Sequence, residues 1–561
     1  MRGRRRVAAL TALALVAGLA ACAPALPESA VPGTEVVVGW TGSFTSTNAA
    51  ASPTGGNLDV AAMTRGRFGD VIDGDFVPDE SFGTVTVVES DPFVVRYDLA
   101  EPAWSDGIPL DAADLLLGWA GSAGYFAADE VADPDATAPG VPAVDEFARA
   151  IQVTYSQQVH DWQSAVGAPV PAHVLGARAL GIEDPMEAKQ AVITAIREDD
   201  ADALEKITTV WNEGFELGDG AVADDLLLSS GPFVIDADDE MVDGGVALDA
   251  NPEFRGLVTP QVARVELVPT GDEPLAAAGD QLDVVQVAPV AANQDAVREL
   301  EREDFTVQTT HDGTLWAMLL KPSGVFGDAL ARSSFIHSAP ARDLMDAAAG
   351  EWSTAYGTST SMTVPPDSRV YEIVNEDSGF AESLGATGVD PAAERAAAGI
   401  AAGAHVCVLY DRGSEFATGA FAALRDLAAE AGWAVEDCGA DDVDAALDEG
   451  DWNAVITRMP IPRSPDEIAA QWGTGGAASI TGQADPTRDE LIARLSQTVD
   501  VYEAREIHAQ IEATIVRAAV ALPIAANPVV TVSDREVTGI SVLKGAVAAL
   551  TTNAAQWAVV P

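Results

Sequence analysis

Basic residues are scarce in this chain of 561 residues. Only 31 lysines and arginines stand against 87 aspartates and glutamates, which gives a formal net charge of −56 at pH 7. A surface this acidic repels nucleic acid and anionic lipid headgroups and favours cations and solubility. Two origins of the charge remain open: an acidic bias of the whole proteome, or selection for attracting cationic ligands. Nucleic acid is excluded as an expected partner.

Long hydrophobic runs are absent after residue 22, where no stretch approaches 18 consecutive apolar residues. The first 22 residues differ. Arginines at positions 2 and 4–6 precede an apolar run, Val7–Leu19, which is too short to span a bilayer. The run ends in Leu-Ala-Ala-Cys and resembles the lipobox of bacterial lipoproteins. It predicts a signal peptide over 1–21, lipidation of Cys22, a tether over 22–33 and a membrane-anchored, extracytoplasmic protein.

Cysteine is rare, and two of the three cysteines lie outside the leader, at Cys407 and Cys438. Residues 405–410 are typical of a buried strand. A helix through residues 421–428 and a second strand from Trp433 follow, so the pattern predicts a right-handed βαβ unit with parallel neighbouring strands. The two cysteines would then lie on or next to adjacent strands.

Three states of this cysteine pair are open. A disulfide between Cys407 and Cys438 would suit an oxidising compartment and would contribute about 3–4 kcal/mol. Free buried thiols are the second state. Zinc bound by both cysteines and His405 is the third, although no fourth ligand is near. We expect the disulfide and no metal.

Familiar catalytic motifs are also missing. The chain has no G-x-S-x-G, no phosphate-binding G-x-x-x-x-G-K-[ST], no H-E-x-x-H and no C-x-x-C, and its six histidines are scattered. The acidic segment 236–243 does not match a calcium-loop spacing, and we interpret it as a hairpin turn. We therefore expect a binding protein, no enzyme, and no cofactor.

Several segments carry a family resemblance. Residues 102–114 resemble the W-S-D-G-x-P-x-T-A-x-D signature of family 5 extracellular solute-binding proteins, the peptide receptors of ABC importers. Further matches follow in the family's order, at 171–175 (P-x-H-V-L), 230–233 (G-P-Y/F), 251–256 (N-P-x-Y-W-G), 278–284 (G-E-x-D-V), 328–335 (D-x-x-V-R-x-A) and 449–455 (G-D-F/Y-D). Most of these motifs have a structural reading, and we expect Trp104 to pack in a core.

The resemblance implies an α/β, periplasmic-binding-protein-like fold of two lobes with an additional inserted domain. Domain I would be discontinuous (34–60, 170–298 and 523–561), domain II would span 61–169, and domain III would span 299–522 with the βαβ unit. Local patterns predict a strand at 35–40, a loop over 41–58, an antiparallel pair within 81–99, a helix capped by Asp111, a strand at 150–155 and helices over 184–228.

The resemblance also implies partners: a peptide or related small solute captured by lobe closure, an ABC permease, and the membrane through the lipid anchor, with the protein a monomer. Segments 91–97, 522–524 and 556–557 also resemble a mycobacterial lipoprotein branch of the family that is implicated in glycolipid assembly. The alternative function is therefore a non-transport envelope lipoprotein of the same fold.

The predicted ligand contacts lie at strand ends facing a crevice. Trp40, Thr41 and Phe44 follow the first strand, Trp316 supplies an aromatic wall, and Arg458 and Asp466 follow the strand ending near residue 456. Peptide receptors commonly carry Gly-Trp and an amine-binding Asp in the stretch that corresponds to 457–466. Its arginines here favour an anionic ligand group instead, with a surface ion pair as the alternative for Arg458.

Overall fold

The computed structural model describes residues 26–560, except 73–74, 128–139, 146–148, 219–221, 238–243, 272, 367, 385–387 and 541–549. The predicted signal peptide, Cys22 and most of the acidic turn at 236–243 lie outside the described residues. The strands flanking that turn do pair antiparallel, as a hairpin requires. No helix among the described residues is long and apolar enough to cross a membrane.

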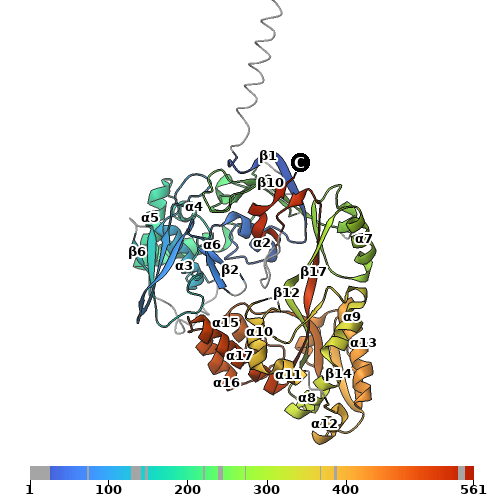
Figure 1. The fold of residues 1–561 in the computed structure, drawn as a ribbon. Helices are drawn as coiled ribbons and strands as arrows, with labels where there is room; N and C mark the ends of the chain where they lie inside the picture. Colours follow the sequence, from blue (N-terminus) through green and yellow to red (C-terminus); the bar gives the residue numbers. More distant parts are fainter. Residues whose placement is uncertain are drawn as a thin grey trace, which may run out of the picture.

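One mixed sheet runs through both lobes of the molecule (Figure 1). In spatial order its strands are β15 (Trp433–Asp437), β14 (Ala404–Tyr410), β16 (Ala454–Pro460), β12 (Thr306–Leu320), β17 (Ala521–Ser533), β11 (Val284–Val287), β1 (Val31–Trp40), β10 (Val262–Pro269), β9 (Val246–Ala250) and β8 (Phe233–Ile235), with β13 (Gly357–Thr358) paired to β17. The α/β class predicted from the sequence is confirmed.

The long strands β12 and β17 connect the two lobes. They pair antiparallel from Thr306 opposite Ser533 to Leu319 opposite Ala521. The end of β17 also pairs with β11, whereas the second half of β12 pairs with β16. We call the elements between β12 and β17 the C-terminal lobe, and the remainder the N-terminal lobe.

The C-terminal lobe has helices on both faces of its part of the sheet. One face packs against α8 (Ala329–His337), α9 (Ala341–Ala349) and α13 (Glu415–Glu430). The other packs against α15 (Pro465–Trp472), α16 (Pro486–Leu495) and α17 (Val501–Ala518). Smaller helices complete the lobe: α10 (Tyr371–Ser378), α11 (Phe380–Leu384), α12 (Pro391–Ala397) and α14 (Val443–Glu449). Both sheet faces are buried, as expected for parallel strands joined by helices.

The βαβ unit is confirmed. β14 and β15 are parallel neighbours, and α13 connects them. Cys407 and Cys438 form a disulfide with a Cα–Cα distance of 5.6 Å. The zinc alternative is wrong because both thiols are consumed by the disulfide and His405 contacts Glu436 instead.

A second sheet lies in the N-terminal lobe, in the order β4 (Gly83–Ser90), β5 (Phe93–Leu99), β7 (Ala150–Tyr155) and β6 (Ala143–Asp145). It shares one core with α3 (Ala112–Ser122), α4 (Ala172–Leu180), α5 (Pro185–Glu198) and α6 (Ala201–Glu213). The strand pair, the strand at 150–155 and the helices over 184–228 are as predicted. Helices α4–α6 follow residue 169, the predicted end of domain II, yet they pack in the same core as residues 68–126. The boundary at 169 stays a prediction.

Two of the family motifs meet at one buried carboxylate, Asp114. Oδ1 accepts hydrogen bonds from Trp104 Nε1 at 3.2 Å and the backbone N–H of Ala172 at 2.9 Å. Oδ2 accepts from the N–H of Asp111 at 3.0 Å, which completes a capping box with the side chain of Asp111. Trp104 is fully buried, so its predicted core role is confirmed.

One loop prediction is wrong. Within 41–58, the helix α2 (Gly55–Thr64) already begins at residue 55, with the Thr54 side chain accepting from the N–H of Asn57. The two glycines at its start are poor helix formers and hide this N-cap in the sequence. The remaining elements include α7 (Ala291–Arg302), the hairpin β2 (Gly69–Ile72) and β3 (Asp75–Pro78), and the terminal pair β18 (Val537–Thr538) and β19 (Ala558–Val559).

Candidate ligand-binding cavity

A cavity of about 1360 Å³ lies where the two lobes meet beside the connecting strands. Residues 288–291, at the start of α7, form one side. The opposite side comes from the end of α9, the segment after β14, the start of α13 and the strand β16. Its size is sufficient for a small organic solute or a short peptide.

The carboxyl ends of parallel strands position one wall. β14 is parallel to both β15 and β16 and ends at Tyr410, directly before the lining residues 411–416. The chain runs from β14 to β15 on one side of it and then crosses to β16 on the other side. The crevice therefore lies at a change of strand order, where ligands commonly bind in open α/β sheets. The Ser414 side chain caps α13 by accepting from the N–H of Ala417.

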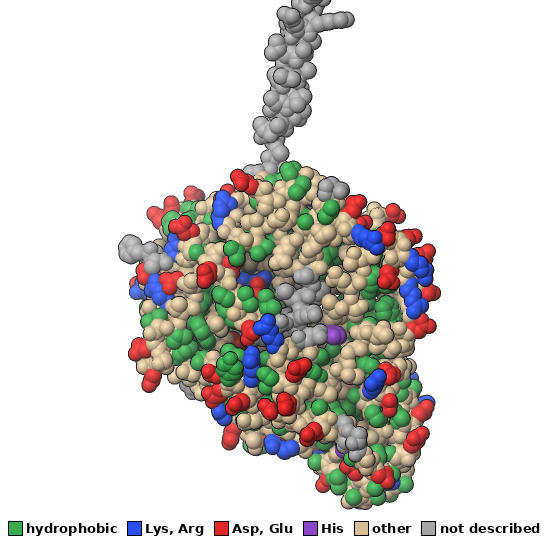
Figure 2. Space-filling model, in the orientation of Figure 1, with side chains coloured by type: hydrophobic (Ala, Val, Ile, Leu, Met, Phe, Trp, Pro, Cys, Tyr) green, Lys and Arg blue, Asp and Glu red, His purple; other side chains and the backbone are tan. Residues whose placement is uncertain are grey.

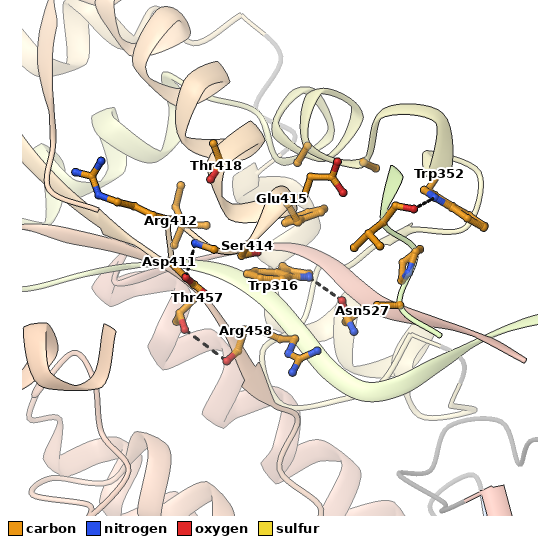
Figure 3. Close-up of a pocket in the computed structure, with 18 of the residues that line it drawn as sticks. Trp316, Trp352, Asp411, Arg412, Ser414, Glu415, Thr418, Thr457, Arg458 and Asn527 are labelled. Atoms are coloured by element: carbon orange, nitrogen blue, oxygen red, sulfur yellow. Dashed lines mark hydrogen bonds between the residues drawn. The ribbon is translucent and has the colours of Figure 1, made fainter. Parts of the chain in front are cut away.

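Four aromatic residues line the cavity, and two of them, Trp316 and Trp352, are labelled in Figure 3. The ring of Phe416 is stacked against Trp316 at a centroid distance of 4.7 Å and against Tyr356 at 4.8 Å. The indole N–H of Trp316 donates to Asn527 Oδ1 at 2.8 Å, and that of Trp352 donates to the carbonyl of Val290 at 2.9 Å. Both indole donors therefore have protein partners, and the rings offer apolar surface to a ligand.

The two guanidinium groups of the lining are each beside a carboxylate. Arg458 lies 3.6 Å from Asp312 and keeps 52% of its side chain exposed, whereas Arg412 lies 3.1 Å from Asp437. Arg412 extends away from the aromatic residues (Figure 3). The ion pair at Arg458 is the alternative that the sequence left open, and it weakens the argument for an anionic ligand.

The pKa of the Tyr356 hydroxyl reflects the charged groups around it. Burial, followed by the carboxylates of Glu415 and Asp312, raises the pKa of Tyr356 to about 12, and Arg458 acts in the opposite direction. The phenol is therefore neutral over the physiological range and can donate a hydrogen bond. Among the described residues, no group of three or more His, Cys, Asp or Glu side chains is arranged to hold a metal ion.

The structure brings together two of the six predicted ligand contacts. Trp316 and Arg458 are direct partners on β12 and β16, and both line the cavity. Trp40 and Phe44 are buried in a different core, where Trp40 Nε1 donates to Asp59 at 2.7 Å.

The two remaining predicted residues are also elsewhere. Thr41 is exposed after β1, and Asp466 is exposed in the first turn of α15. Neither residue lines the cavity. We predicted that the ends of these strands meet at one crevice, whereas the cavity lies on the side of β12 and β17 that faces α7. Whether any of the six contacts ligand stays a prediction.

Sequence reasoning missed Phe416, Tyr356 and Asn527. Phe416 had a usable signal, because it follows the end of β14 by six residues and opens the next helix. Tyr356 and Asn527 had none: the first lies in an irregular segment after α9, and the second in an apolar strand where an amide is inconspicuous. Their roles depend on pairing between distant segments.

The lobes also touch on the side away from this cavity. His160 Nδ1 lies 2.7 Å from the carbonyl of Thr498, and the N–H of His160 donates to the carbonyl of Ser496 at 2.9 Å. Asp75 in the N-terminal lobe is 3.5 Å from Arg505 and 3.7 Å from Arg369 in the C-terminal lobe. The described structure is therefore one in which the lobes contact each other.

No protein-family profile matches this chain, but similar proteins are known. Uncharacterized lipoprotein Rv2585c of Mycobacterium tuberculosis is 25% identical over 456 residues, which span 78% of this chain and 77% of the relative. Uncharacterized lipoprotein ML0489 of Mycobacterium leprae is 33% identical over 193 residues, or 33% of this chain and 32% of the relative. The similarity to mycobacterial lipoproteins is thus confirmed.

Solved structures match over nearly the whole chain. The periplasmic EDTA-binding protein EppA superposes with a TM-score of 0.75 at 17% identity, covering 96% of this chain and 98% of its own. A putative peptide-binding protein, AppA of Clostridium difficile, gives 0.69 at 13% identity, and the ABC transporter substrate-binding protein CtaP of Listeria monocytogenes gives 0.68 at 16%. Each covers 94% of this chain and 100% of its own. The fold that the motif resemblance implied is therefore confirmed: this chain has the fold of these solved solute-binding proteins.

Proposed function

We propose that the protein is the substrate-binding component of an ABC importer and that it captures peptides or related small solutes by lobe closure. The observation that carries this proposal is the position of the cavity. It lies between residues 288–291 of the N-terminal lobe and α13 of the C-terminal lobe, beside strands β12 and β17 that connect them. A rotation of the two lobes about these strands changes the width of the cavity, so that ligand binding is coupled to lobe closure.

Contacts across the cavity support this coupling. The side chain of Glu415, at the start of α13, accepts a hydrogen bond at 2.9 Å from the N–H of Ala291, at the start of α7. Trp352 makes the corresponding contact with Val290 from the end of α9. Because both contacts join the lobes at the cavity, a ligand there can stabilise the closed arrangement by its differential affinity for it.

The partners follow from the same proposal. A lipid on Cys22 would hold the protein at the outer face of the cytoplasmic membrane, and a permease would receive the solute. The protein would act as a monomer and release its ligand chemically unchanged. The anchor is tested by Cys22→Ser, which should abolish fatty-acid labelling and release the protein from the membrane fraction; a labelled, membrane-bound variant would contradict it.

The binding role is tested by screening solutes and short peptides for an increase in the thermal unfolding temperature, followed by calorimetric titration. We expect at least one chemical class to bind with 1:1 stoichiometry and to be recovered unchanged. A screen in which no solute raises the unfolding temperature argues against a receptor, and conversion of a bound solute to product argues for an enzyme.

A further inference from the structure

Charge in the cavity is strongly unbalanced. Its lining includes six carboxylates: Glu351, Asp411, Glu415, Asp441, Asp442 and Asp444. Only two cations, Arg412 and Arg458, accompany them, and each has its own carboxylate partner outside the lining. The cavity therefore gains little positive potential from its arginines.

Most of these carboxylates lack a compensating cation. Glu351 lies 3.3 Å from Arg298, but the described part of the chain gives no ion-pair partner to the other five. Three are used as acceptors by backbone N–H groups: Asp411 by Gly413, Glu415 by Ala291, and Asp442 by Ala445. These bonds position the carboxylates without neutralising them.

The aromatic wall provides a second, independent feature. Trp316, Phe416 and Tyr356 form a continuous stack, and Trp352 lies on the same cavity with its indole N–H satisfied. Aromatic faces attract organic cations, and this attraction grows where water is excluded. Phe416 is stacked between the other two rings, so the ring faces left for a ligand are the outer ones of the stack. An anion there would meet both these negative faces and the carboxylates.

We propose that the cavity binds a positively charged organic solute, with an ammonium or guanidinium group held by the lining carboxylates and its apolar part against the aromatic stack. The charge of the whole chain reinforces this selection: its net charge is −56, and acidic side chains are spread over the face seen in Figure 2, so the surface attracts cations. This inference rests on the proposed binding function and specifies the class of ligand. It replaces the anionic ligand that the arginines of residues 457–466 had suggested.

Three tripeptides of equal length test the charge preference: Arg-Phe-Arg, Gln-Phe-Gln and Glu-Phe-Glu. Calorimetric titration of the mature, full-length protein in 20 mM salt should give Arg-Phe-Arg at least tenfold tighter binding than Gln-Phe-Gln, with no measurable binding of Glu-Phe-Glu. Raising the salt to 0.5 M should weaken Arg-Phe-Arg severalfold more than Gln-Phe-Gln, since ionic screening acts on the charged contacts.

A pair of variants on α14 locates the effect. Asp444 and Asp448 are both exposed on this helix, but only Asp444 lines the cavity. Asp444→Asn should weaken Arg-Phe-Arg about threefold, as expected for one partly screened charge near the ligand. Asp448→Asn removes the same charge from the protein and should leave the affinity unchanged. Both variants should keep the unfolding temperature of the native protein.

The outcomes separate the two proposals. Equal or tighter binding of Gln-Phe-Gln or Glu-Phe-Glu overturns the cationic class and leaves the receptor intact. Equal losses in Asp444→Asn and Asp448→Asn also overturn it, because the attraction would then be a property of the whole surface. If no tripeptide binds, the cationic class fails for peptides of this size, whereas the receptor proposal is decided by the broader solute screen.

Discussion

The ammonium group of Lys189 lies 2.8 Å from Oδ2 of Asp114, and both side chains are almost completely buried. The same ammonium donates to the carbonyl of Pro109 at 2.6 Å and lies 3.3 Å from Asp111. The pair thus ties helix α5 to the turn that carries the W-S-D-G motif and to the start of α3. That motif is a structural unit: Trp104, Asp114 and Lys189 form one hydrogen-bonded network inside the lobe.

Removing one partner from this network should be costly. Lys189→Ala leaves the Asp114 carboxylate buried without its cation, so we expect the free energy of unfolding to fall by about 3–5 kcal/mol. Lys206→Ala, at an exposed position on α6, is the matched control and should change it by less than about 0.5 kcal/mol. Urea denaturation of the two variants decides the matter, and equal stabilities would contradict the role of the pair.

Arg65 is a half-buried charge whose partners are backbone carbonyls. Its guanidinium donates to the carbonyls of Pro169 at 2.7 Å, Leu228 at 2.9 Å and Thr47 at 2.9 Å, which lie on three separate segments. Burial lowers the pKa of Arg65 to about 10. Arg65 therefore holds together three segments of the N-terminal lobe that are far apart in the sequence.

A lysine cannot reproduce this fork of donors. Arg65→Lys should lower the free energy of unfolding by about 2–3 kcal/mol, because at least two buried carbonyls lose their partners. Arg67→Lys, two residues further on and paired with Asp70 at the surface, is the control. If thermal melts show the same unfolding temperature for both variants, Arg65 does not fasten these segments.

His508 predicts a pH dependence of stability. Burial, with the nearby His160, lowers the pKa of His508 to about 4, although a hydrogen bond to the backbone of Thr363 opposes the shift. The unfolded state, with an ordinary pKa near 6.5, then binds more protons than the folded state between about pH 6.5 and 4. Stability is therefore fully present above pH 6.5 and is lost as the pH falls through this window.

A variant isolates this contribution. His508→Gln should reduce the loss of unfolding free energy between pH 7 and pH 4.5 by about 1–2 kcal/mol. Glu512, one turn further along α17, has a pKa raised by burial and contributes in the opposite direction in both proteins. Parallel profiles for the native protein and His508→Gln would refute the assignment.

The disulfide should stabilise the C-terminal lobe. Cys407 and Cys438 are 31 residues apart, and closing a loop of this length in the unfolded chain contributes about 3–4 kcal/mol. Replacing both cysteines by alanine should lower the free energy of unfolding by this amount. Peptide mapping of exported protein without reductant should recover the two cysteine peptides linked; recovery of both as freely alkylated thiols would remove the disulfide.

The sequence predicted elements whose determinants are local. Asp111 predicted the start of α3 because a cap and its helix are adjacent in the chain. The βαβ unit around Cys407 was predicted from the succession of a strand pattern, a helix pattern and a second strand pattern. The cavity is different. Trp316 and Phe416 are 100 positions apart, and only the pairing of β12 with β16 and the packing of α13 bring them into contact.

The other predicted contacts show the same limit. Trp40 is the last residue of β1 and Phe44 follows the strand, yet both pack in a core that includes α2 and the C-terminal segment. An aromatic residue at a strand end has the same local sequence whether it faces a crevice or a core. The ion pair between Arg458 and Asp312 likewise depends on the register of β12 against β16, which the local sequence does not reveal.

The central claim is that a solute binds in the cavity between α7 and α13, and native mass spectrometry of protein purified from its own cells tests it most directly. Thr418 lines the cavity, whereas Asp426 is exposed further along the same helix, outside the lining. Thr418→Trp places a bulky indole ring in the cavity, where it competes for space with a ligand, and Asp426→Trp adds the same ring outside it. We predict a ligand mass on the native protein and on Asp426→Trp that is missing from Thr418→Trp. A ligand retained equally by Thr418→Trp, or a native protein without any bound solute, would contradict the account.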